Sequence, residues 1–251
     1  MRKYKFKVLF TQIIAVTLLI GLWEFGAKKG WINEFIFSSP SKVLETGMSL
    51  IRNGELFSHI STTLGEIGIA FAIGIGIGFT VSVILYSSKF LADVVEPFLT
   101  ILNSLPKVAL GPIIIIWVGA NTNSIILMAI LINVFISIIT IYNGFIHTDE
   151  LRVKLFKTFK ASKWQILTKL VIPSSLATIV SALKINISLT LIGVIMGEFL
   201  VSKKGLGYLI LYGTQVFNLN LVITGVFVLV IISVLLYKLV EMLDKMFKKV
   251  N

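Results

Sequence analysis

The sequence lacks cysteine and is poor in charged residues. The absence of cysteine from its 251 residues excludes a disulfide framework and a thiolate metal site. Asp, Glu, Lys and Arg make up 14% of the chain, whereas a soluble domain carries roughly 25%. Hydrophobic residues make up 56%, so the chain cannot cover itself with polar surface. Its main solvent is therefore lipid, as expected for an integral membrane protein.

Residues that carry out chemistry are also scarce. His59 and His147 have no second candidate metal ligand near them, and no HExxH, GxSxG or Ser-His-Asp motif occurs. We therefore predict no catalytic residue, no metal and no cofactor, hence no enzyme. The run Gly74-Ile-Gly76-Ile-Gly78 is not a phosphate loop, because no strand precedes it and no Lys-Ser/Thr follows it. We interpret these glycines, with Gly65 and Gly68, as sites where helices approach closely in lipid.

Six apolar runs are long enough to predict transmembrane helices, which need about 20 residues each. They cover approximately residues 8–26, 60–86, 94–118, 124–145, 174–200 and 218–237. We read the first as an uncleaved span, because Trp23 and Glu24 stand where a signal peptide would have small residues. The third contains Pro106 and Pro112, so we expect a kinked or broken helix. Broken helices at membrane depth favour a transport path over an inert anchor.

The net charge of +11 reflects membrane topology rather than nucleic-acid binding, because the basic residues lie between the apolar runs. An even number of spans places both termini on one side. That side carries most of the Lys and Arg and is predicted to be cytoplasmic. Its basic residues are Arg2, Lys3, Lys5, Lys7, Lys89, Arg152, Lys154, Lys157, Lys160, Lys163, Lys169, Lys238, Lys245, Lys248 and Lys249. The opposite side has Lys28, Lys29, Lys42, Arg52, Lys203 and Lys204.

The chain reads as one membrane domain, residues 1–251. Residues 1–59 form the first span and a short outer-surface helix, which Ser39 caps, Pro40 begins and Asn53-Gly54 ends. Residues 60–251 form the core, with a cytoplasmic loop at about 149–173.

Polar residues within the spans are candidates for the translocation path. Glu66 and Lys184 are the deepest charges, and either a structural ion pair or a path charge is consistent with their positions. Lys107 lies near a span end, where its side chain can reach the interface. Polar side chains in spans also bond neighbouring helices, which is the alternative for the whole set. The path candidates are Asn103, Ser104, Asn133, Lys184, Asn186, Ser188 and Glu198.

The loop segment KTFKASKWQILTKLVIP, residues 157–173, is basic and amphipathic. Ser162 and Gln165 form a capping-box pattern, so we expect two short helices that meet near residues 160–162. The residues alone leave two interpretations open. The helices lie on anionic headgroups, or they dock on a soluble partner through an apolar face.

The same segment resembles the cytoplasmic signature loop of ABC importer permeases. That pattern is Glu-Ala-Ala, three residues, Gly, nine residues, Ile, one residue, Leu-Pro. Leu170, Ile172 and Pro173 match its end, and KASKWQ resembles the usual Gly-Ala-Ser-Arg-Trp-Gln. Lys160 stands in the glycine position, and Lys154-Leu155-Phe156 replaces Glu-Ala-Ala. Either another residue, with the cap at Ser162, makes the bend, or the docking geometry differs from that of the family.

Three further segments resemble the nitrate, sulfonate and taurine branch of this family, which includes permeases for thiamine precursors and riboflavin. They are Ser39-Pro40-Ser41 before KVLET, the stretch NSLPKVALGPIIIIWVG, and GEFLVSKKGLGYLI at residues 197–210. The four motifs occur in the order of the family, and the resemblance covers essentially the whole chain.

The resemblance implies an all-α type I ABC importer permease fold in the bacterial plasma membrane. It implies a homodimer of this chain, two copies of a separate ATPase that binds ATP, and an extracytoplasmic solute-binding protein. The expected solute is a small organic anion of the sulfonate, taurine or nitrate type, a thiamine precursor or riboflavin. The residues expected to dock the ATPase are Phe156, Phe159, Lys160, Ala161 and Trp164, while Ile166 and Leu170 pack back on the membrane core. The alternatives are a stand-alone carrier or channel that uses Glu66 and Lys184, and a structural membrane protein.

Overall fold

The computed structural model describes residues 2–248, and the side chains of residue 4 and residues 6–242. Lys249, one of the predicted cytoplasmic cations, lies outside the described residues. Residues 2–248 form helices and turns without a strand, which confirms the all-α prediction. The helices are α1 (Arg2–Lys28), α2 (Glu34–Phe37), α3 (Pro40–Arg52), α4 (Glu55–Ser87), α5 (Lys89–Ser104), η1 (Lys107–Leu110), α6 (Gly111–Val118), α7 (Thr122–Ile146), α8 (Glu150–Thr158), α9 (Lys163–Ile166), η2 (Leu167–Val171), α10 (Ile172–Ser174), α11 (Leu176–Val201), α12 (Leu206–Gln215) and α13 (Leu219–Lys248).

Five of these helices contain stretches long and apolar enough to cross a membrane. The stretches are Phe6–Lys28, Glu55–Ser87, Thr122–Ile146, Leu176–Val201 and Leu219–Met242. A sixth candidate is the pair formed by Lys89–Ser104 and Lys107–Val118, which is bent by 83°. The prediction of about six spans with a broken third one agrees with this arrangement.

The break in the third span lies at the predicted proline. α5 ends at Ser104, Pro106 precedes the 3₁₀ turn η1, and Pro112 stands in the first turn of α6. The side chain of Lys107 crosses the break, because its Nζ donates to the carbonyl oxygen of Asn103 at 2.6 Å. A lysine that reaches the last carbonyls of a helix stabilises that end. Lys107 therefore caps α5, in addition to any contact with the interface.

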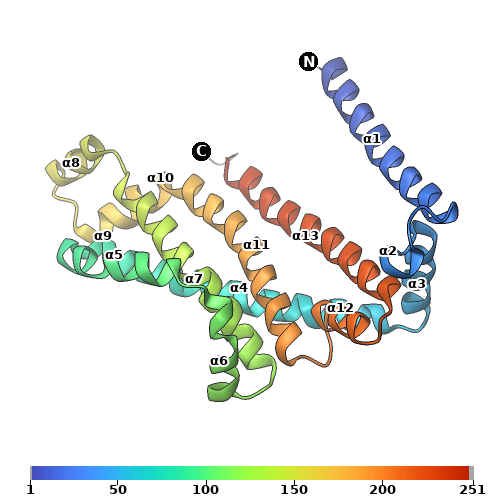
Figure 1. Ribbon diagram of the computed structural model, residues 1–251. Helices are drawn as coiled ribbons and strands as arrows, with labels where there is room; N and C mark the ends of the chain where they lie inside the picture. The colour runs from blue at the N-terminus through green and yellow to red at the C-terminus, as the bar shows by residue number, and fades with distance from the viewer. Residues whose placement is uncertain (1, 249–251) are drawn as a thin grey trace.

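α7 forms the centre of the bundle and lies between α4 and α11 (Figure 1). The approach is close because small residues line it. A Cβ at Gly74 would collide with the side chain of Asn133, and a Cβ at Gly78 with Ser137. The glycine interpretation holds for these two. At Gly65, Gly68 and Gly76, which are exposed, a Cβ meets no described atom within 4 Å, so these three glycines do not set a close approach between the described helices.

α1 stands apart from the other long helices in Figure 1. None of the residues in its most apolar 18-residue window is buried. Its contact with the body is made near its C-terminal end, where the ring of Trp23 stacks on Phe227 of α13 at 6.1 Å between centroids. The apolar surface of α1 therefore needs lipid or another protein chain to cover it.

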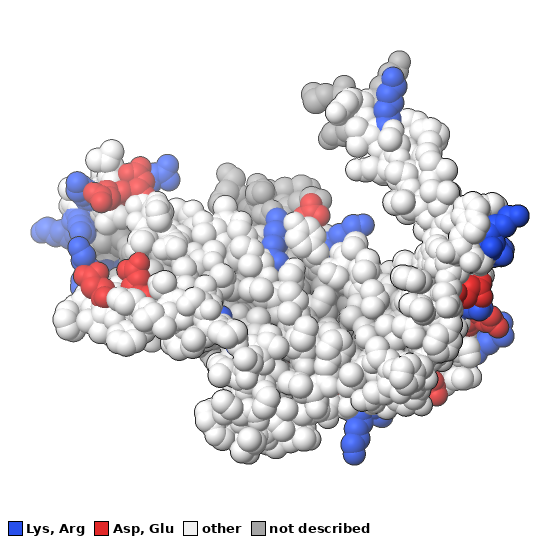
Figure 2. All heavy atoms as spheres, viewed as in Figure 1, with Lys and Arg blue, Asp and Glu red and all other residues white. Residues whose placement is uncertain are grey.

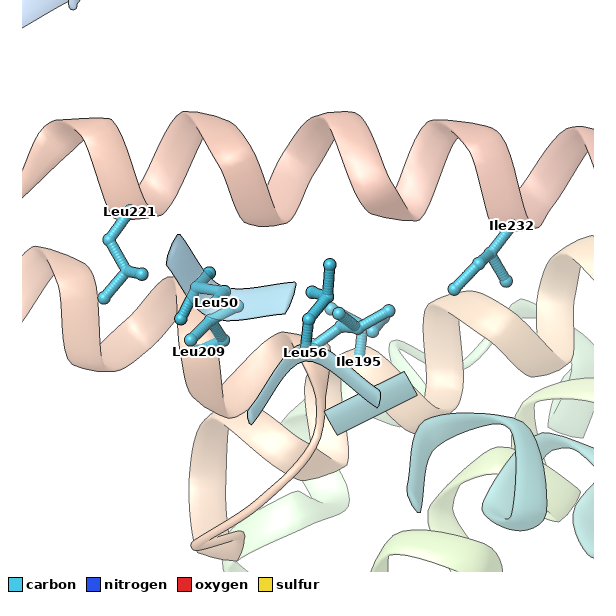
Figure 3. Packing of buried hydrophobic residues seen from close by; sticks show 7 residues of the cluster. Leu50, Leu56, Ile195, Leu209, Leu221 and Ile232 are labelled. Atoms are coloured by element: carbon cyan, nitrogen blue, oxygen red, sulfur yellow. The ribbon is translucent and has the colours of Figure 1, made fainter. Parts of the chain in front are cut away.

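We call the end of the bundle that carries α8, α9 and α10 the loop end, and the opposite end the α12 end (Figure 1). The predicted short helix after the first span is α3, with Pro40 at its start and Gly54, at φ 73°, after its end. It packs into the body at the α12 end. Its Leu50 belongs to an apolar cluster with side chains from four other helices, which are Leu56, Ile195, Leu209, Leu221 and Ile232 (Figure 3). Helix α12 itself was not expected from the sequence.

Candidate functional site

Two regions of the structure combine the predicted site residues with specific geometry. The first is the corner between α8 and α9 at the loop end. α8 begins at an Asp149 cap, whose side chain accepts from the backbone N–H of Leu151 at 2.8 Å. The helix ends at Thr158, and the chain then reverses over four residues, 159–162, before α9.

The reversal is a complete Schellman motif. The N–H of Ala161 donates to the carbonyl of Phe156 at 3.1 Å, and the N–H of Lys160 to the carbonyl of Lys157 at 2.9 Å. These two bonds define the motif, in which the residue after the helix takes a left-handed conformation that glycine prefers. Lys160 takes it, with φ 54°. The bend at the position of the family's glycine is therefore made by Lys160 itself, although a side chain there is strained.

The restart of the helix follows the predicted capping box. The N–H of Gln165 donates to Ser162 Oγ at 3.2 Å, and the N–H of Ser162 donates to Gln165 Oε1 at 2.8 Å. Each residue thereby satisfies a backbone donor of the other, as in the capping-box pattern. The prediction of two short helices that meet at residues 160–162 is confirmed.

The corner has an anchored side and an exposed side. Ile166 and Leu170 are buried in an apolar cluster with Phe145 of α7, as expected. Of the five predicted docking residues, Phe156 and Ala161 are half-buried against the same cluster. Phe159 and Trp164 are 76% and 66% exposed, and Lys160 is exposed as well. The predicted docking set is thus divided between two residues that hold the corner and three that face outward.

The surroundings of the corner are charged. Figure 2 shows Lys, Arg, Asp and Glu gathered mainly at the two ends of the molecule, with broad uncharged surface between them. A cavity of about 470 Å³ lies beside the corner, and its lining includes Lys89, Lys157, Lys163 and Trp164. Exposed aromatic groups beside several cations form a surface suited to a polar partner rather than to the lipid interior.

The second region is a buried junction at the α12 end, where the sequence had placed Glu198 among the path candidates. Helix α12 begins directly after the turn that follows α11, and its first N–H groups have no partner within the helix. Side chains from α4 and α11 supply those partners. Thr63 Oγ1 accepts from the N–H of Leu206 at 2.8 Å, and Glu198 Oε2 accepts from the N–H of Gly207 at 2.5 Å.

Thr63 also joins the two long helices, because its Oγ1 donates to Glu198 Oε1 at 2.6 Å. The turn before α12 is held by a third bond, in which His59 Nδ1 accepts from the N–H of Gly205, one residue before Leu206, at 3.0 Å. Since Nδ1 is the acceptor, the proton of this imidazole lies on Nε2. We call the set of His59, Thr63, Glu66, Glu198 and the turn Gly205–Gly207 the carboxyl junction.

The glycines of the GLG motif are required by this contact. Gly205 has φ 110°, and a Cβ there would collide with the Glu198 carboxyl. A Cβ at Gly207 would come within 2.9 Å of Glu198 and of the Ile195 carbonyl oxygen. The backbone can therefore approach the carboxylate only because both positions lack a side chain. A carboxylate at a helix N-terminus is favoured by the helix dipole as well as by these bonds.

Glu66 lies next to Glu198 in the same junction. It is 3% exposed, and Glu198 is fully buried. Neither carboxyl oxygen of Glu66 has a hydrogen-bond partner among the described residues. The sequence singled out Glu66 and Lys184 as the deepest charges in the spans. In the structure, the titratable group beside Glu66 is the carboxyl of Glu198.

The other path candidates fall into two groups. Asn133 and Asn186 are buried, and Asn133 Nδ2 donates to Thr190 Oγ1 at 2.7 Å, which joins α7 to α11. Asn103 is half-exposed, and Ser104 and Ser188 are exposed. Lys184 is half-buried and takes part in an interaction. Within the described residues, no group of three or more His, Cys, Asp or Glu is placed to hold a metal ion.

His59 and Thr63 were missed as members of the junction. Their sequence signal is the spacing of His59, Thr63 and Glu66 at i, i+4 and i+7, which places all three on one face of a helix. That spacing alone does not reveal what lies opposite this face.

Residues 68–249 match the model of the family described as "Binding-protein-dependent transport system inner membrane component". A probable ABC transporter permease protein of Haemophilus influenzae is 31% identical over 230 residues, which are 91% of this chain and 93% of the relative. The putative aliphatic sulfonates transport permease protein SsuC of Bacillus subtilis is 25% identical and matches 93% of this chain and 84% of that protein. The formylaminopyrimidine transport permease protein ThiX of Halalkalibacterium halodurans is 27% identical, with 90% of each chain covered.

A solved structure with a similar fold is that of the MetNI methionine ABC transporter in an inward-facing conformation. It has a TM-score of 0.68 and 21% sequence identity to this chain, and it covers 78% of this chain and 96% of the matched one. At this identity the likeness concerns the fold.

Proposed function

Because this chain belongs to the family of binding-protein-dependent transport system inner membrane components and has the type I ABC importer permease fold, we propose that it forms the solute path of an importer and couples that path to a separate ATPase. The ATPase subunits bind and hydrolyse ATP, and this chain breaks no bond. ATP-driven closure of the ATPase pair shifts a two-state membrane element toward the outward-open arrangement through the docked corner.

The corner between α8 and α9 is the observation that carries this proposal. Its anchored side ties it to α7 and α11 through Phe156, Ala161 and the buried cluster. Its exposed side presents Phe159 and Trp164 at the loop end. An exposed aromatic pair on a rigid, doubly capped corner is the arrangement expected of a helix that fills a groove on a partner. Force applied to the exposed side reaches the membrane helices through the anchored side.

Substitution on the exposed side tests this assignment. Phe159→Ala and Trp164→Ala each remove an aromatic group that is available to the partner, without opening the core. Phe90→Ala is a matched control, because Phe90 is 79% exposed on α5, outside the predicted docking set. The measurement is co-purification of the ATPase, and stimulation of ATP hydrolysis by the solute-binding protein, for the assembled transporter in lipid. We expect both to fall several-fold for Phe159→Ala and Trp164→Ala only.

Unchanged co-purification and stimulation for both variants would reject the docking assignment. Solute flux through liposomes that contain this chain alone, with no ATPase, would instead support a stand-alone carrier or channel. Ala161→Asp examines the anchored side separately, because it places a charge against the apolar cluster that holds the corner.

We propose that a second copy of this chain completes the permease. The apolar surface of α1 and a cavity of about 670 Å³ between α1, α3, α4 and α13 leave a large face of the protein uncovered. A solute passing between two copies would meet Asn103, Ser104 and Ser188, which lie at exposed or half-exposed positions. Asn133 and Glu198 would act on the path by holding helices together, whereas Asn186 donates to the Ala182 carbonyl of its own helix. Lys184 remains a candidate path charge.

The proposed orientation follows from charge. Both termini and the corner lie in the cytoplasm, and the α12 end faces outward, where a solute-binding protein delivers its load. The proposed solute is a small organic anion of the sulfonate, taurine or nitrate type, a thiamine precursor or riboflavin. Two of the named relatives are described as permeases for aliphatic sulfonates and for formylaminopyrimidine. Thermal-shift measurements of the partner binding protein with sulfonates, nitrate, pyrimidines and flavins would identify it.

A further inference from the structure

The carboxyl junction contains two buried acidic side chains. Glu66 of α4 and Glu198 of α11 are nearly or fully removed from solvent, and their carboxyl groups are neighbours. Two ionised carboxylates at such a site would repel strongly, because the surrounding medium has a low dielectric constant. The pair is compatible with its burial when one member is neutral.

The hydrogen bonds distinguish the two carboxyls. Glu198 accepts from Thr63 Oγ1 on one oxygen and from the N–H of Gly207 on the other. It also faces the backbone of Tyr208 at the start of α12. Such donors and a helix N-terminus stabilise a carboxylate. Glu66 has none of them, since no described residue donates to either of its oxygens. The charge therefore belongs on Glu198 and the proton on Glu66.

We infer that Glu66 and Glu198 form a proton-binding site, in which the Glu66 carboxylic acid donates its O–H to the Glu198 carboxylate. One proton is bound by the pair, and its release to water leaves two carboxylates. A proton suits the site better than a metal ion. Calcium takes about 6–8 oxygen ligands, whereas the junction offers two carboxyls and a hydroxyl that is already bonded.

The bound proton would stabilise the contact between α4 and the start of α12. With the proton present, Thr63 and Glu66 of α4 both bind Glu198, and Glu198 in turn holds the glycine turn. With the proton lost, two like charges face each other across the α4–α11 contact. The expected result is a weaker junction at alkaline pH, at the end of the bundle opposite the corner. This inference concerns the chain itself and does not depend on the proposed solute or ATPase docking.

Other titratable groups around the junction also enter its pH dependence. α7 has no charged residue between Thr122 and Ile146. Lys184 lies 14 residues before Glu198 on α11, which is about 21 Å along a helix. The remaining groups are His59 of α4, the exposed Lys203 and Lys204 of the turn, Tyr208 of α12, and Lys238 and Glu241 of α13. The last two are near Val240 in the sequence, and Val240 packs in one cluster with Ile67 of α4.

Infrared difference spectroscopy tests the site directly on the full-length chain in lipid. A protonated carboxylic acid has a C=O stretch that ionised carboxylates lack and that shifts in D₂O. We expect this band at neutral pH in the wild type, and its loss in Glu66→Gln. Glu55→Gln is the control, because Glu55 is an exposed carboxyl at the start of the same helix. No such band in the wild type, or a band that persists in Glu66→Gln, overturns the inference.

A second measurement separates a proton site from a general loss of folding. The glutamine of Glu66→Gln is neutral and of similar size, and its amide can still donate to Glu198. This variant therefore retains the arrangement in which Thr63 and residue 66 both bind Glu198. We expect the melting temperature of the wild type in detergent to fall as the pH rises from about 6 to about 9, beyond the range in which an ordinary carboxyl titrates. The variant should lose most of this fall. Parallel melting curves for the two proteins across that range would also overturn the inference.

Discussion

Thr63 of α4 and Glu198 of α11 are joined by a 2.6 Å hydrogen bond from Thr63 Oγ1 to Glu198 Oε1. The same hydroxyl oxygen accepts from the N–H of Leu206, so one side chain connects three helices. The carboxylate, the threonine and the first turn of α12 consequently form one unit. Loss of any member leaves a buried polar group of another without its partner.

The first prediction removes this hydroxyl. Thr63→Val keeps the branched shape but leaves the Leu206 N–H unpaired and takes one donor from Glu198. We expect a loss of about 1–3 kcal/mol in the free energy of unfolding, the cost of a buried group left unsatisfied. The measurement is the melting temperature in detergent. The control is Thr62→Val, because the Thr62 hydroxyl bonds only the Ser58 carbonyl of its own helix. Equal effects of the two substitutions would contradict the role of Thr63.

The second prediction concerns the left-handed residue of the corner. Lys160 has φ 54° at the position where a Schellman motif favours glycine. Lys160→Gly should therefore stabilise the corner, by about 1 kcal/mol if the strain of a left-handed side chain is fully relieved. Lys157→Gly is the matched control. It lies within α8, where glycine costs about 1 kcal/mol.

Hydrogen exchange of the amides of α8 and α9 reports this local stability. Slower exchange in Lys160→Gly and faster exchange in Lys157→Gly are the expected results. Faster exchange in both variants would show that the Lys160 side chain contributes more through its contacts than its backbone conformation costs.

The third prediction separates two glycines of the GIGIG run. Gly78→Ala places a Cβ against Ser137 of α7 and should destabilise the bundle, because overpacking in a close helix contact costs roughly 1–3 kcal/mol. Gly76→Ala, two residues away, meets no described atom within 4 Å. It should be neutral or stabilising, since alanine is favoured over glycine in a helix by about 1 kcal/mol. Melting temperatures of the two variants in detergent give the comparison, and a common sign would contradict it.

Local chemistry explains which parts of this structure could be predicted. The break at Pro106 follows from a missing N–H, and the cap at Ser162 follows from a two-residue pattern, so both are encoded within a few neighbouring positions. The apolar runs are similarly local, because about 20 apolar residues have few stable forms other than a span.

The parts that could not be predicted depend on which distant segment packs against a given helix face. The spacing of His59, Thr63 and Glu66 defines a face of α4, but the turn that it caps is about 140 residues further along the chain. The 83° bend between α5 and α6 is likewise not determined by local sequence, because proline fixes the place of a break and not its angle. With Lys160 in the glycine position, the sequence suggested that another residue makes the bend or that the docking geometry differs. Lys160 instead adopts the glycine-like conformation, because the bonds made by its own N–H and that of Ala161 hold it there.

The last prediction tests whether the corner transmits force as a rigid unit. Ser162→Ala removes the hydroxyl that caps the N–H of Gln165, and loss of an N-cap costs about 1 kcal/mol of local helix stability. The exposed aromatic groups stay in place, so the ATPase should still co-purify, whereas stimulation of its ATP hydrolysis by the binding protein should fall. Thr168→Ala is the control, because its hydroxyl bonds only the Trp164 carbonyl. If Ser162→Ala lowers co-purification and stimulation together, the cap shapes the docking surface itself rather than the stiffness behind it.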